Sequence, residues 1–193
     1  QLSNRVGRLD PATGDIKIVE MTEAKSRPYG IKLAADGTPW FACNGKPCIV
    51  RIDPKTMELS VVKVPGKKGR VRRLDFDSQG NIWYVNSGEG RLGRYSPATG
   101  EIKEWPSPSG AKSHPYAIVV VNDIVWYNES GQRPDALVRF DPKTETFQSW
   151  AIPSGGVHAG IIRHMRRTAD GNIVIHQSST NRIILVTPGA APR

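Results

Sequence analysis

The sequence lacks the features that mark membrane-spanning, helical and fibrous proteins. Its longest strictly apolar run is the five residues from Ala117 to Val121, far short of the roughly 20 needed to cross a bilayer. No segment shows a sustained 3.6-residue apolar pattern, and the 19 glycines have no three-residue period. These absences exclude a membrane span, a helical bundle and a collagen-like chain.

Acidic residues are also scarce. The chain has 18 Asp and Glu against 27 Lys and Arg, which gives a formal net charge of +9. A charge of this sign favours acidic partners or negatively charged surfaces. The densest basic run, Lys67 to Arg73, has no aromatic stacking motif or recognition helix beside it, so we do not predict nucleic acid as a partner.

Turn-forming residues are abundant by contrast, and they recur at a fixed period. The 19 Gly and 15 Pro among 193 residues are typical of a chain that reverses direction many times. An Asp-Pro-x-Thr sequence returns at steps of 43, 43, 45 and 46 residues, and Trp40, Trp83 and Trp126 repeat at the same period. The copies are Asp10 to Thr13, Asp53 to Thr56, Ser96 to Thr99, Asp141 to Thr144 and, in degenerate form, Thr187 and Pro188. Two markers with one period predict a repeat architecture.

Each period contains four short runs rich in β-branched and aromatic residues, which predict four strands. In one repeat they are Tyr29 to Ala34, Thr38 to Cys43, Ile49 to Asp53 and Glu58 to Val64. In the next they are Val71 to Phe76, Ile82 to Asn86, Arg91 to Tyr95 and Glu101 to Trp105. Four strands in about 43 residues match one blade of a β-propeller. The Asp-Pro-x-Thr turn then joins the third strand to the fourth, and we expect its residues and four of the five Trp to serve blade packing.

The predicted fold class is therefore all-β, a propeller of four-stranded antiparallel blades with about four and a half blades present. The predicted units are 1–24, the end of an incomplete blade; 25–66, 67–109 and 110–154, three blades; and 155–193, a last blade without its fourth strand. Because the first predicted strand, Arg5 to Leu9, is a third strand, we expect this chain to be the C-terminal part of a longer propeller.

Four segments also have recognisable sequence motifs: Asn4 to Pro11, Arg27 to Ile31, Asp36 to Phe41 and Leu92 to Tyr95. They resemble the repeat of the virginiamycin B lyase (streptogramin lyase) family, in which Pro-x-Gly-Ile leads through Asp-Gly-x-x-Trp-Phe to Asn-x-Ile-Gly-Arg-Ile. The resemblance covers nearly the whole chain. It implies a seven-bladed ring, with roughly 90 to 100 further residues outside this sequence.

The resemblance also implies an activity. The characterised lyases of this family use magnesium to open a cyclic depsipeptide antibiotic by elimination, with a first-strand His as base and a Glu at the end of the second strand helping to hold the metal. The positions that match the base are Tyr29, Arg72, Tyr116 and Arg163, and those that match the Glu are Asn44, Ser87, Ser130 and Ser178. The matched positions thus lack the catalytic pair. His114, His164 and Glu129 are the nearest catalytic candidates, each one residue away, although such a shift on a strand turns the side chain to the opposite face.

The starts of the first strands face the central channel in propellers, and here they predict a basic and aromatic rim. Convergent guanidinium and imidazole groups suit an anionic or strongly hydrogen-bonding small molecule. The predicted ligand-binding residues are Tyr29, Arg72, Arg73, Tyr116, Arg163, His164 and His176. Tyr29 and Tyr116 recur at equivalent blade positions, so packing between blades is an alternative role for these two. The run from Lys67 to Arg73 is interpreted as a solvated loop that leads cations toward the channel.

The sequence predicts no metal site, because His158 and His176 have no partner at ligand spacing and the two cysteines stand alone. Cys43 and Cys48 flank a four-residue loop, which favours a hairpin disulfide, with a pair of free thiols as the alternative. A disulfide would place the protein in an oxidising compartment, periplasmic or secreted, whereas free thiols leave a cytoplasmic location open.

Three functions are compatible with these patterns. The first is a streptogramin lyase-like propeller, a metal-dependent carbon–oxygen lyase acting on a cyclic peptide or another small molecule. The second is a non-catalytic propeller that binds a ligand or a protein partner in the periplasm or outside the cell. The third is a gluconolactonase-like hydrolase, which needs a channel cluster of Glu, Asn and Asp that Glu129, Asn86 and Asn128 do not clearly supply. Fold alone does not decide between them, so enzymatic activity stays an open question here.

Overall fold

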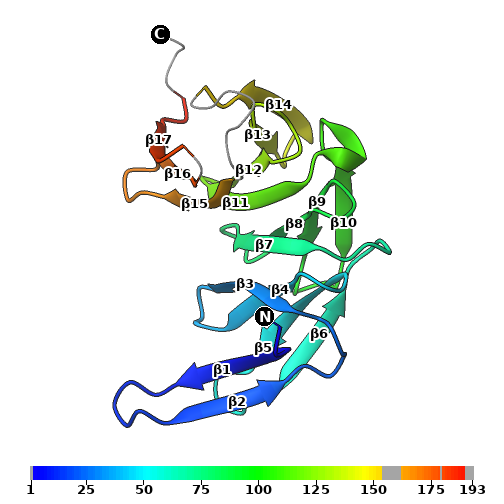
Figure 1. Cartoon of the computed structure of the whole chain (residues 1–193), viewed down its shortest axis with the longest axis vertical. Coiled ribbons are helices and arrows are strands. Elements are labelled where there is room, and N and C mark those ends of the chain that lie inside the picture. The colour runs from blue at the N-terminus through cyan, green and yellow to red at the C-terminus, as the bar shows by residue number, and fades with distance from the viewer. Residues whose placement is uncertain (1, 154–161, 179, 190–193) are drawn as a thin grey trace.

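The computed structural model describes residues 2–153, 162–178 and 180–189, and these form five antiparallel sheets that follow one another along the molecule (Figure 1). The first sheet pairs β1 (Arg5–Leu9) with β2 (Ile16–Glu20). Three four-stranded sheets come next, and the last sheet has three strands among the described residues. The architecture is an all-β propeller, as predicted.

The strands of each sheet are hydrogen-bonded in chain order. The second sheet contains β3 (Pro28–Leu33), β4 (Pro39–Cys43), β5 (Cys48–Ile52) and β6 (Leu59–Lys63). The third contains β7 (Val71–Phe76), β8 (Ile82–Asn86), β9 (Arg91–Tyr95) and β10 (Ile102–Pro106). The fourth contains β11 (Pro115–Val121), β12 (Ile124–Glu129), β13 (Ala136–Asp141) and β14 (Thr146–Ala151), preceded by the 3-10 helix η1 (Gly110–Lys112). The last contains β15 (Ile162–Arg167), β16 (Ile173–Gln177) and β17 (Arg182–Val186). The strands predicted above are confirmed to within one residue at each end.

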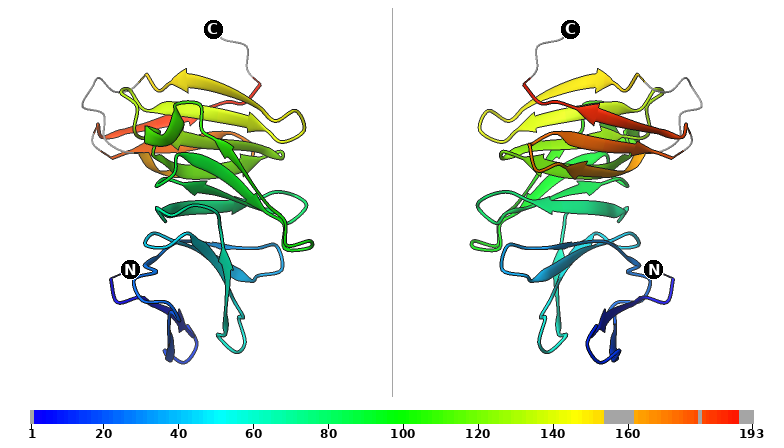
Figure 2. Two further views of the ribbon diagram at one scale, coloured as in Figure 1. Left: turned by 90° about the vertical axis from the view of Figure 1, so that its right-hand side faces the viewer. Right: turned by 90° about the vertical axis from the view of Figure 1, so that its left-hand side faces the viewer.

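The first strands of successive sheets lie next to one another. β3 contacts β7, β7 contacts β11, and β11 contacts β15, so these four first strands form the inner edge of the series of sheets (Figures 1 and 2). The described residues include no helix long and apolar enough to cross a membrane.

Inner strand β11 shows how one strand serves two blade interfaces. All seven of its residues are buried. Because side chains alternate across a strand, Ala117, Val119 and Val121 join the core toward the last sheet, while Ile118 and Val120 join the core toward the third sheet. A strand buried on both faces reads as a continuous apolar run, which is why this segment is the longest in the sequence.

Each hydrophobic cluster lies between two successive sheets. Trp40, Trp83 and Trp126 occupy equivalent positions, and each packs in the cluster toward the following sheet. Trp105 stacks on Trp83 with ring centroids 5.6 Å apart. Four of the five Trp are thus buried, as expected, whereas Trp150 is 46% exposed.

The exposed Trp150 borders a cavity in the described structure. This cavity has a volume of about 740 Å³ and is lined by apolar residues of the fourth and last sheets, including Trp126, Trp150 and Ile184. At the interface between the third and fourth sheets, Phe147 of β14 packs on Phe140 of the buried cluster.

The Asp-Pro-x-Thr turns are held by the Asp side chains. Asp10, Asp53 and Asp141 each accept a hydrogen bond from the backbone amide two residues later, at 2.9, 2.8 and 3.1 Å. The fifth position of the turn has a positive φ in the first four copies: 80° at Gly14, 68° at Met57, 76° at Gly100 and 55° at Glu145. A residue other than glycine is strained at such a φ, so we expect the side chains of Met57 and Glu145 to stabilise the fold through other contacts.

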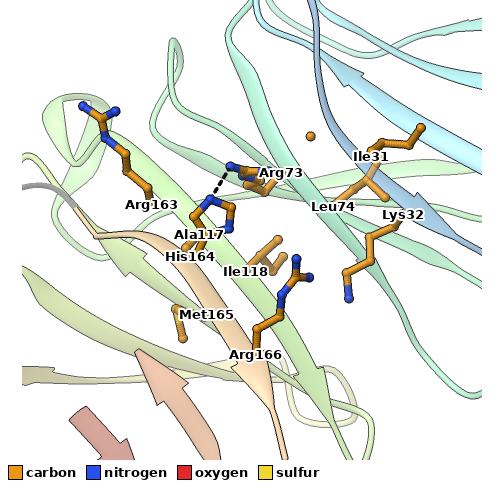
Figure 3. Close-up of a pocket in the computed structure, with 11 residues that line it drawn as sticks. Ile31, Lys32, Arg73, Leu74, Ala117, Ile118, Arg163, His164, Met165 and Arg166 are labelled. Atoms are coloured by element: carbon orange, nitrogen blue, oxygen red, sulfur yellow. Dashed lines mark hydrogen bonds between the residues drawn. The ribbon is translucent and has the colours of Figure 1, made fainter. Parts of the chain in front are cut away.

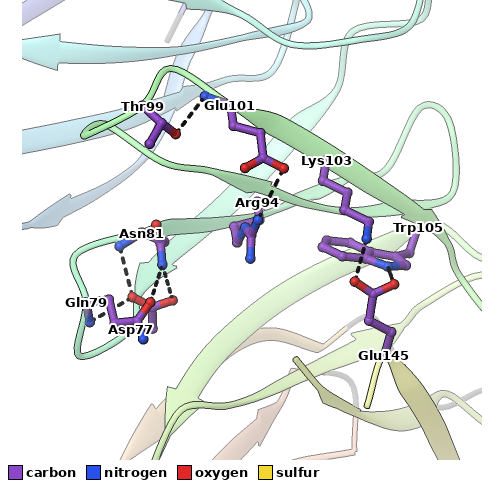
Figure 4. A network of polar contacts seen from close by, with 9 residues as sticks. All are labelled: Asp77, Gln79, Asn81, Arg94, Thr99, Glu101, Lys103, Trp105 and Glu145. Carbon is purple, nitrogen blue, oxygen red and sulfur yellow. Dashed lines mark hydrogen bonds and ion pairs between the residues drawn. The ribbon is translucent and has the colours of Figure 1, made fainter. Parts of the chain in front are cut away.

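Met57 and Glu145 do contribute to packing between blades. Met57 is buried in the cluster between the first and second sheets. Glu145 reaches the neighbouring sheet, where it accepts hydrogen bonds from Lys103 Nζ at 2.5 Å and Trp105 Nε1 at 3.2 Å (Figure 4). Each side chain offsets the conformational strain of its position by stabilising a blade interface.

Candidate ligand site at the channel mouth

The candidate site begins where the inner strands start. Tyr29 near the start of β3 and Tyr116 near the start of β11 meet through their hydroxyl groups, with their rings edge to face at 6.3 Å. The pair spans the intervening strand β7. Gly30 allows β3 to lie close to β7, because a Cβ atom at this position would lie 2.6 Å from the carbonyl oxygen of Arg72.

Two arginines of β7 stack on these tyrosines. The Arg72 guanidinium carbon lies 4.6 Å from the Tyr116 ring centroid, and that of Arg73 lies 4.9 Å from the Tyr29 centroid. Stacking on an aromatic face orients the planar guanidinium and leaves its edge free for hydrogen bonds. The two tyrosines therefore support the arginines by stacking, whereas a ligand-binding role for them stays a prediction.

Arg73 also reaches across the channel to the last sheet. Its Nη2 atom lies 3.1 Å from Nε2 of His164, as Figure 3 shows. His164 pairs in register with His176 on the neighbouring strand β16, so both imidazoles lie on one face of that sheet. Arg73, Arg163 and His164 line one small cavity of about 30 Å³, which has room for one or two water-sized groups.

The cavity lining is strongly cationic. Lys32, Arg73, Arg163 and Arg166 all line it, and none of its described lining residues is acidic. The nearby Asp75 is engaged: it accepts hydrogen bonds from Lys32 Nζ at 2.9 Å and from the Val120 amide at 3.0 Å. The cavity lining thus has more positive charge than the neighbouring Asp75 carboxylate balances.

Two buried donors at this site have no partner. The Nε atoms of Arg72 and Arg73 are inaccessible to solvent and make no hydrogen bond within the described structure. Buried polar groups in folded proteins are almost always hydrogen-bonded, and each exception needs an explanation. A ligand or ordered water that accepts from these donors supplies one.

The local environment changes the acid–base behaviour of the site. Burial lowers the pKa of His164 below its usual value, and the positive charges of Arg73 and Arg166 lower it further. His164 is therefore neutral at pH 7 and able to accept a hydrogen bond from Arg73. Burial raises the pKa of Tyr116, and the hydrogen bond with Tyr29 adds to this effect.

The other catalytic candidates lie away from this cavity. His114 precedes β11, and its Nδ1 atom lies 3.1 Å from the carbonyl oxygen of Ser87. Glu129 is fully buried, and its carboxylate accepts hydrogen bonds from the amide and the hydroxyl of Ser109. The structure thus places His114, Glu129 and His164 in separate local networks. His158 lies outside the described residues.

The described residues do not fit a magnesium ion. Mg²⁺ prefers carboxylate and carbonyl oxygens, whereas this cavity presents guanidinium, ammonium and imidazole groups. No group of three or more His, Cys, Asp or Glu side chains in the described ranges is arranged to hold a metal.

Cys43 and Cys48 form the predicted disulfide, with their Cα atoms 5.3 Å apart. They end β4 and begin β5, and both are buried in the cluster between the first and second sheets. The bond closes the loop at the channel-mouth end of the second sheet.

Sequence reasoning missed Lys32 and Arg166 as parts of the site. Both line the cavity from positions farther along inner strands β3 and β15. A signal existed for Arg166, because it lies two residues after His164 and therefore on the same face of its strand.

Comparison with known proteins now places the chain among its relatives. The profile of the virginiamycin B lyase family matches residues 1–191. The chain belongs to the virginiamycin B lyase family. The family resemblance seen in the repeat motifs is therefore confirmed. None of the curated proteins matches the chain significantly.

Solved structures show the same fold at low sequence identity. A catalytically inactive virginiamycin B lyase from Staphylococcus aureus with quinupristin aligns with a TM-score of 0.84 and 22% identity, over 97% of this chain and 61% of that one. A streptogramin B lyase structure aligns with a TM-score of 0.76 and 20% identity, over 98% and 63%. A putative 6-phosphogluconolactonase from Bacteroides uniformis aligns with a TM-score of 0.67 and 13% identity, over 93% and 59%. The chain thus spans about three-fifths of the length of these lyase structures.

Proposed function

We propose that this family member binds a small molecule through an anionic group at the channel mouth. The observation that carries the proposal is the pair of buried, unpartnered Nε atoms of Arg72 and Arg73. Arg73 lines a cavity whose described lining is cationic and contains no acidic residue, and Arg72 precedes it on the same strand. A carboxylate or phosphate oxygen would satisfy these donors and balance the charge.

The site is prepared for such a group before it binds. The stacked tyrosines orient both guanidinium groups, so little side-chain freedom remains to be lost on binding. Neutral His164 adds a group that can gain a proton when an anion enters, because an added negative charge raises the pKa of an imidazole. The cavity admits only the anionic group, so the rest of the ligand would lie outside it.

A second candidate function is ring opening of a cyclic peptide by the whole protein. Family membership and the structural likeness to a lyase solved with quinupristin support it. Magnesium would supply Lewis-acid chemistry, but its ligands would have to be other than the described residues. We derive no catalytic step from His114, His164 or Glu129, because no contact brings them together.

A gluconolactonase-like hydrolase is disfavoured by the hydrogen bonds of its candidate residues. Asn128 Oδ1 accepts from the Ala117 amide at 2.8 Å, and Glu129 is held by Ser109. Both are buried and committed to the backbone, so neither faces a ligand.

Calorimetric titration of the purified protein with inorganic phosphate and with citrate tests the anion site. Arg73→Gln should weaken binding about tenfold or more, because it removes one charge-assisted contact. Lys143→Gln at the opposite end removes the same charge and should change the affinity less than about twofold. Equal losses in both variants would show that binding reflects net charge and not this site.

Incubation with quinupristin and magnesium, followed by chromatography and mass spectrometry, tests the enzyme candidates. Elimination opens the ester by breaking its carbon–oxygen bond and moving a proton, so the product has a new retention time and an unchanged mass. Hydrolysis adds the mass of one water. An unchanged retention time at high protein concentration would leave the non-catalytic binding function.

A further inference from the structure

The contact between Arg73 and His164 fixes the protonation state of the histidine. Arg73 Nη2 lies 3.1 Å from His164 Nε2, and the two side chains face each other from β7 and β15 (Figure 3). A guanidinium group has donors only, so the imidazole nitrogen must accept the hydrogen bond. His164 is therefore neutral in this contact, and both residues line the small cavity.

His164 also occupies part of the position that an anion would take on Arg73. A carboxylate, sulfate or phosphate binds an arginine strongly through two parallel hydrogen bonds to one edge of the guanidinium. Nε and Nη2 form such an edge. Nη2 donates to His164, whereas Nε makes no hydrogen bond within the described structure and is inaccessible to solvent while the imidazole is in this position. We call this contact the His164 cap.

Protonation of His164 would remove the cap. An imidazolium has two N–H donors and no acceptor, so it cannot accept a hydrogen bond from Arg73. Two positively charged donor groups at this separation repel each other unless an anion lies between them. Protonation would thus release Nη2 of Arg73 and place a second donor beside it.

The surroundings of His164 keep the cap in place at pH 7. Desolvation lowers the pKa of His164, and the positive charge of Arg73 lowers it further. An anion that enters would act in the opposite direction and favour the imidazolium. The other charged or titratable groups around the histidine among the described residues are Arg163 and Arg166 on β15, His176 on β16, Tyr116 on the adjacent strand β11, and Lys32 of the same cavity with its ion-pair partner Asp75.

We propose that the His164 cap makes anion binding dependent on proton uptake. The neutral imidazole holds Arg73 at pH 7, and an anion replaces it when His164 takes up one proton from solvent. The imidazolium then donates to one oxygen of the anion, while Arg73 donates through Nε and Nη2. This inference rests on the proposed anion site and adds how that site is regulated: binding becomes tighter as the pH falls.

Calorimetric titration with sodium sulfate at constant ionic strength tests this coupling, because sulfate keeps two negative charges at both pH values used. The unmodified protein should bind sulfate at least about tenfold more tightly at about pH 5 than at about pH 8. Titrations at one intermediate pH, in buffers that differ in ionisation enthalpy, measure the protons taken up with the anion. Net uptake should accompany binding.

Two replacements of His164, whose side chain is exposed, distinguish a cap from a simple donor. His164→Gln keeps an acceptor for Arg73 but cannot gain a proton, so its affinity should be low at both pH values. His164→Ala removes the cap and should bind sulfate about threefold or more tightly than the unmodified protein at the higher pH. The control His114→Gln changes an imidazole that contacts Ser87 and should retain the pH dependence.

The outcomes separate this inference from the proposed function. Equal sulfate affinity at both pH values, without proton uptake, would overturn the cap and leave the anion site in place, whereas no binding at either pH would overturn both. Three results with the variants would also contradict the cap: retained pH dependence in His164→Gln, its loss in His114→Gln, or weaker binding by His164→Ala at the higher pH. Proton uptake needs no variant, so it decides the question if a variant does not fold.

Discussion

The two ends of the blades use charged residues in opposite ways. One end of the blades carries the Asp-Pro-x-Thr turns, and we call it the turn end. There the recurring aspartates accept hydrogen bonds from the backbone of their own turns and hold the strands in place. At the channel-mouth end, the positions equivalent to Tyr29 change from blade to blade, to Arg72, Tyr116 and Arg163. A repeated residue with a local partner thus maintains the fold, whereas departures from the repeat give the channel its chemistry.

The largest effect is expected at the turn end, for Asp77→Ala. The Asp77 carboxylate accepts hydrogen bonds from the Gln79 and Asn81 amides at 3.0 and 2.9 Å (Figure 4). It also accepts one from the buried indole of Trp83 at 2.9 Å. Its loss leaves these donors unsatisfied and should lower the free energy of unfolding by about 3 kcal/mol, measured by urea denaturation.

The matched variant at the other end is Arg163→Gln. Because Arg163 is exposed and belongs to the channel mouth, its replacement should change the free energy of unfolding by less than about 0.5 kcal/mol. Similar decreases in the free energy of unfolding for Asp77→Ala and Arg163→Gln would contradict the division into a structural and a functional end.

A somewhat smaller effect is expected for the disulfide, the main covalent support of the channel-mouth end. Replacing both Cys43 and Cys48 by Ala removes a short closed loop and should lower the free energy of unfolding by about 2 kcal/mol. The unmodified protein should lose stability in reductant by a similar amount, while the double variant should not respond. A protein equally stable with and without reductant would contradict this.

The turn carboxylates also predict a dependence on pH. Hydrogen bonds from turn amides and hydroxyls hold the pKa of Asp36, Asp53 and Asp141 below their usual value. Since the folded-state pKa is the lower one, the stabilisation is present above the unfolded-state pKa and is lost as the pH falls through the folded-state pKa. Urea denaturation should therefore show decreasing stability below about pH 4, and Asp53→Asn should flatten the curve.

The smallest effect concerns His164, and it requires NMR titration of the imidazole. Burial and the neighbouring arginines lower its pKa, so Arg73→Gln should raise it, and so should saturating phosphate. A pKa that is unchanged by both would show that no anion enters beside this residue. Lys143→Gln, at the turn end, should leave the titration curve in place.

Much of the fold could be predicted, because propeller information is local. The two-residue alternation and the turn chemistry of a 43-residue repeat lie within short segments, so strand ends agreed to within one residue. The disulfide was also local, since Cys43 and Cys48 face each other across one hairpin. The candidate site was only partly predictable: the sequence indicated which residues point toward the channel, but not which of them meet.

The repeat pattern and the composition are enough to predict the blade, its turns, the family and the excess of positive charge. Three contacts appear only in the folded chain: Arg73 with His164, 91 positions later, the tyrosines with the arginines, and Glu129 with a backbone segment. The two groups of features differ in the range of the interactions that produce them. Hydrogen bonds within a turn depend on neighbours in the chain, whereas contacts across the channel depend on how whole sheets pack, which no single repeat encodes.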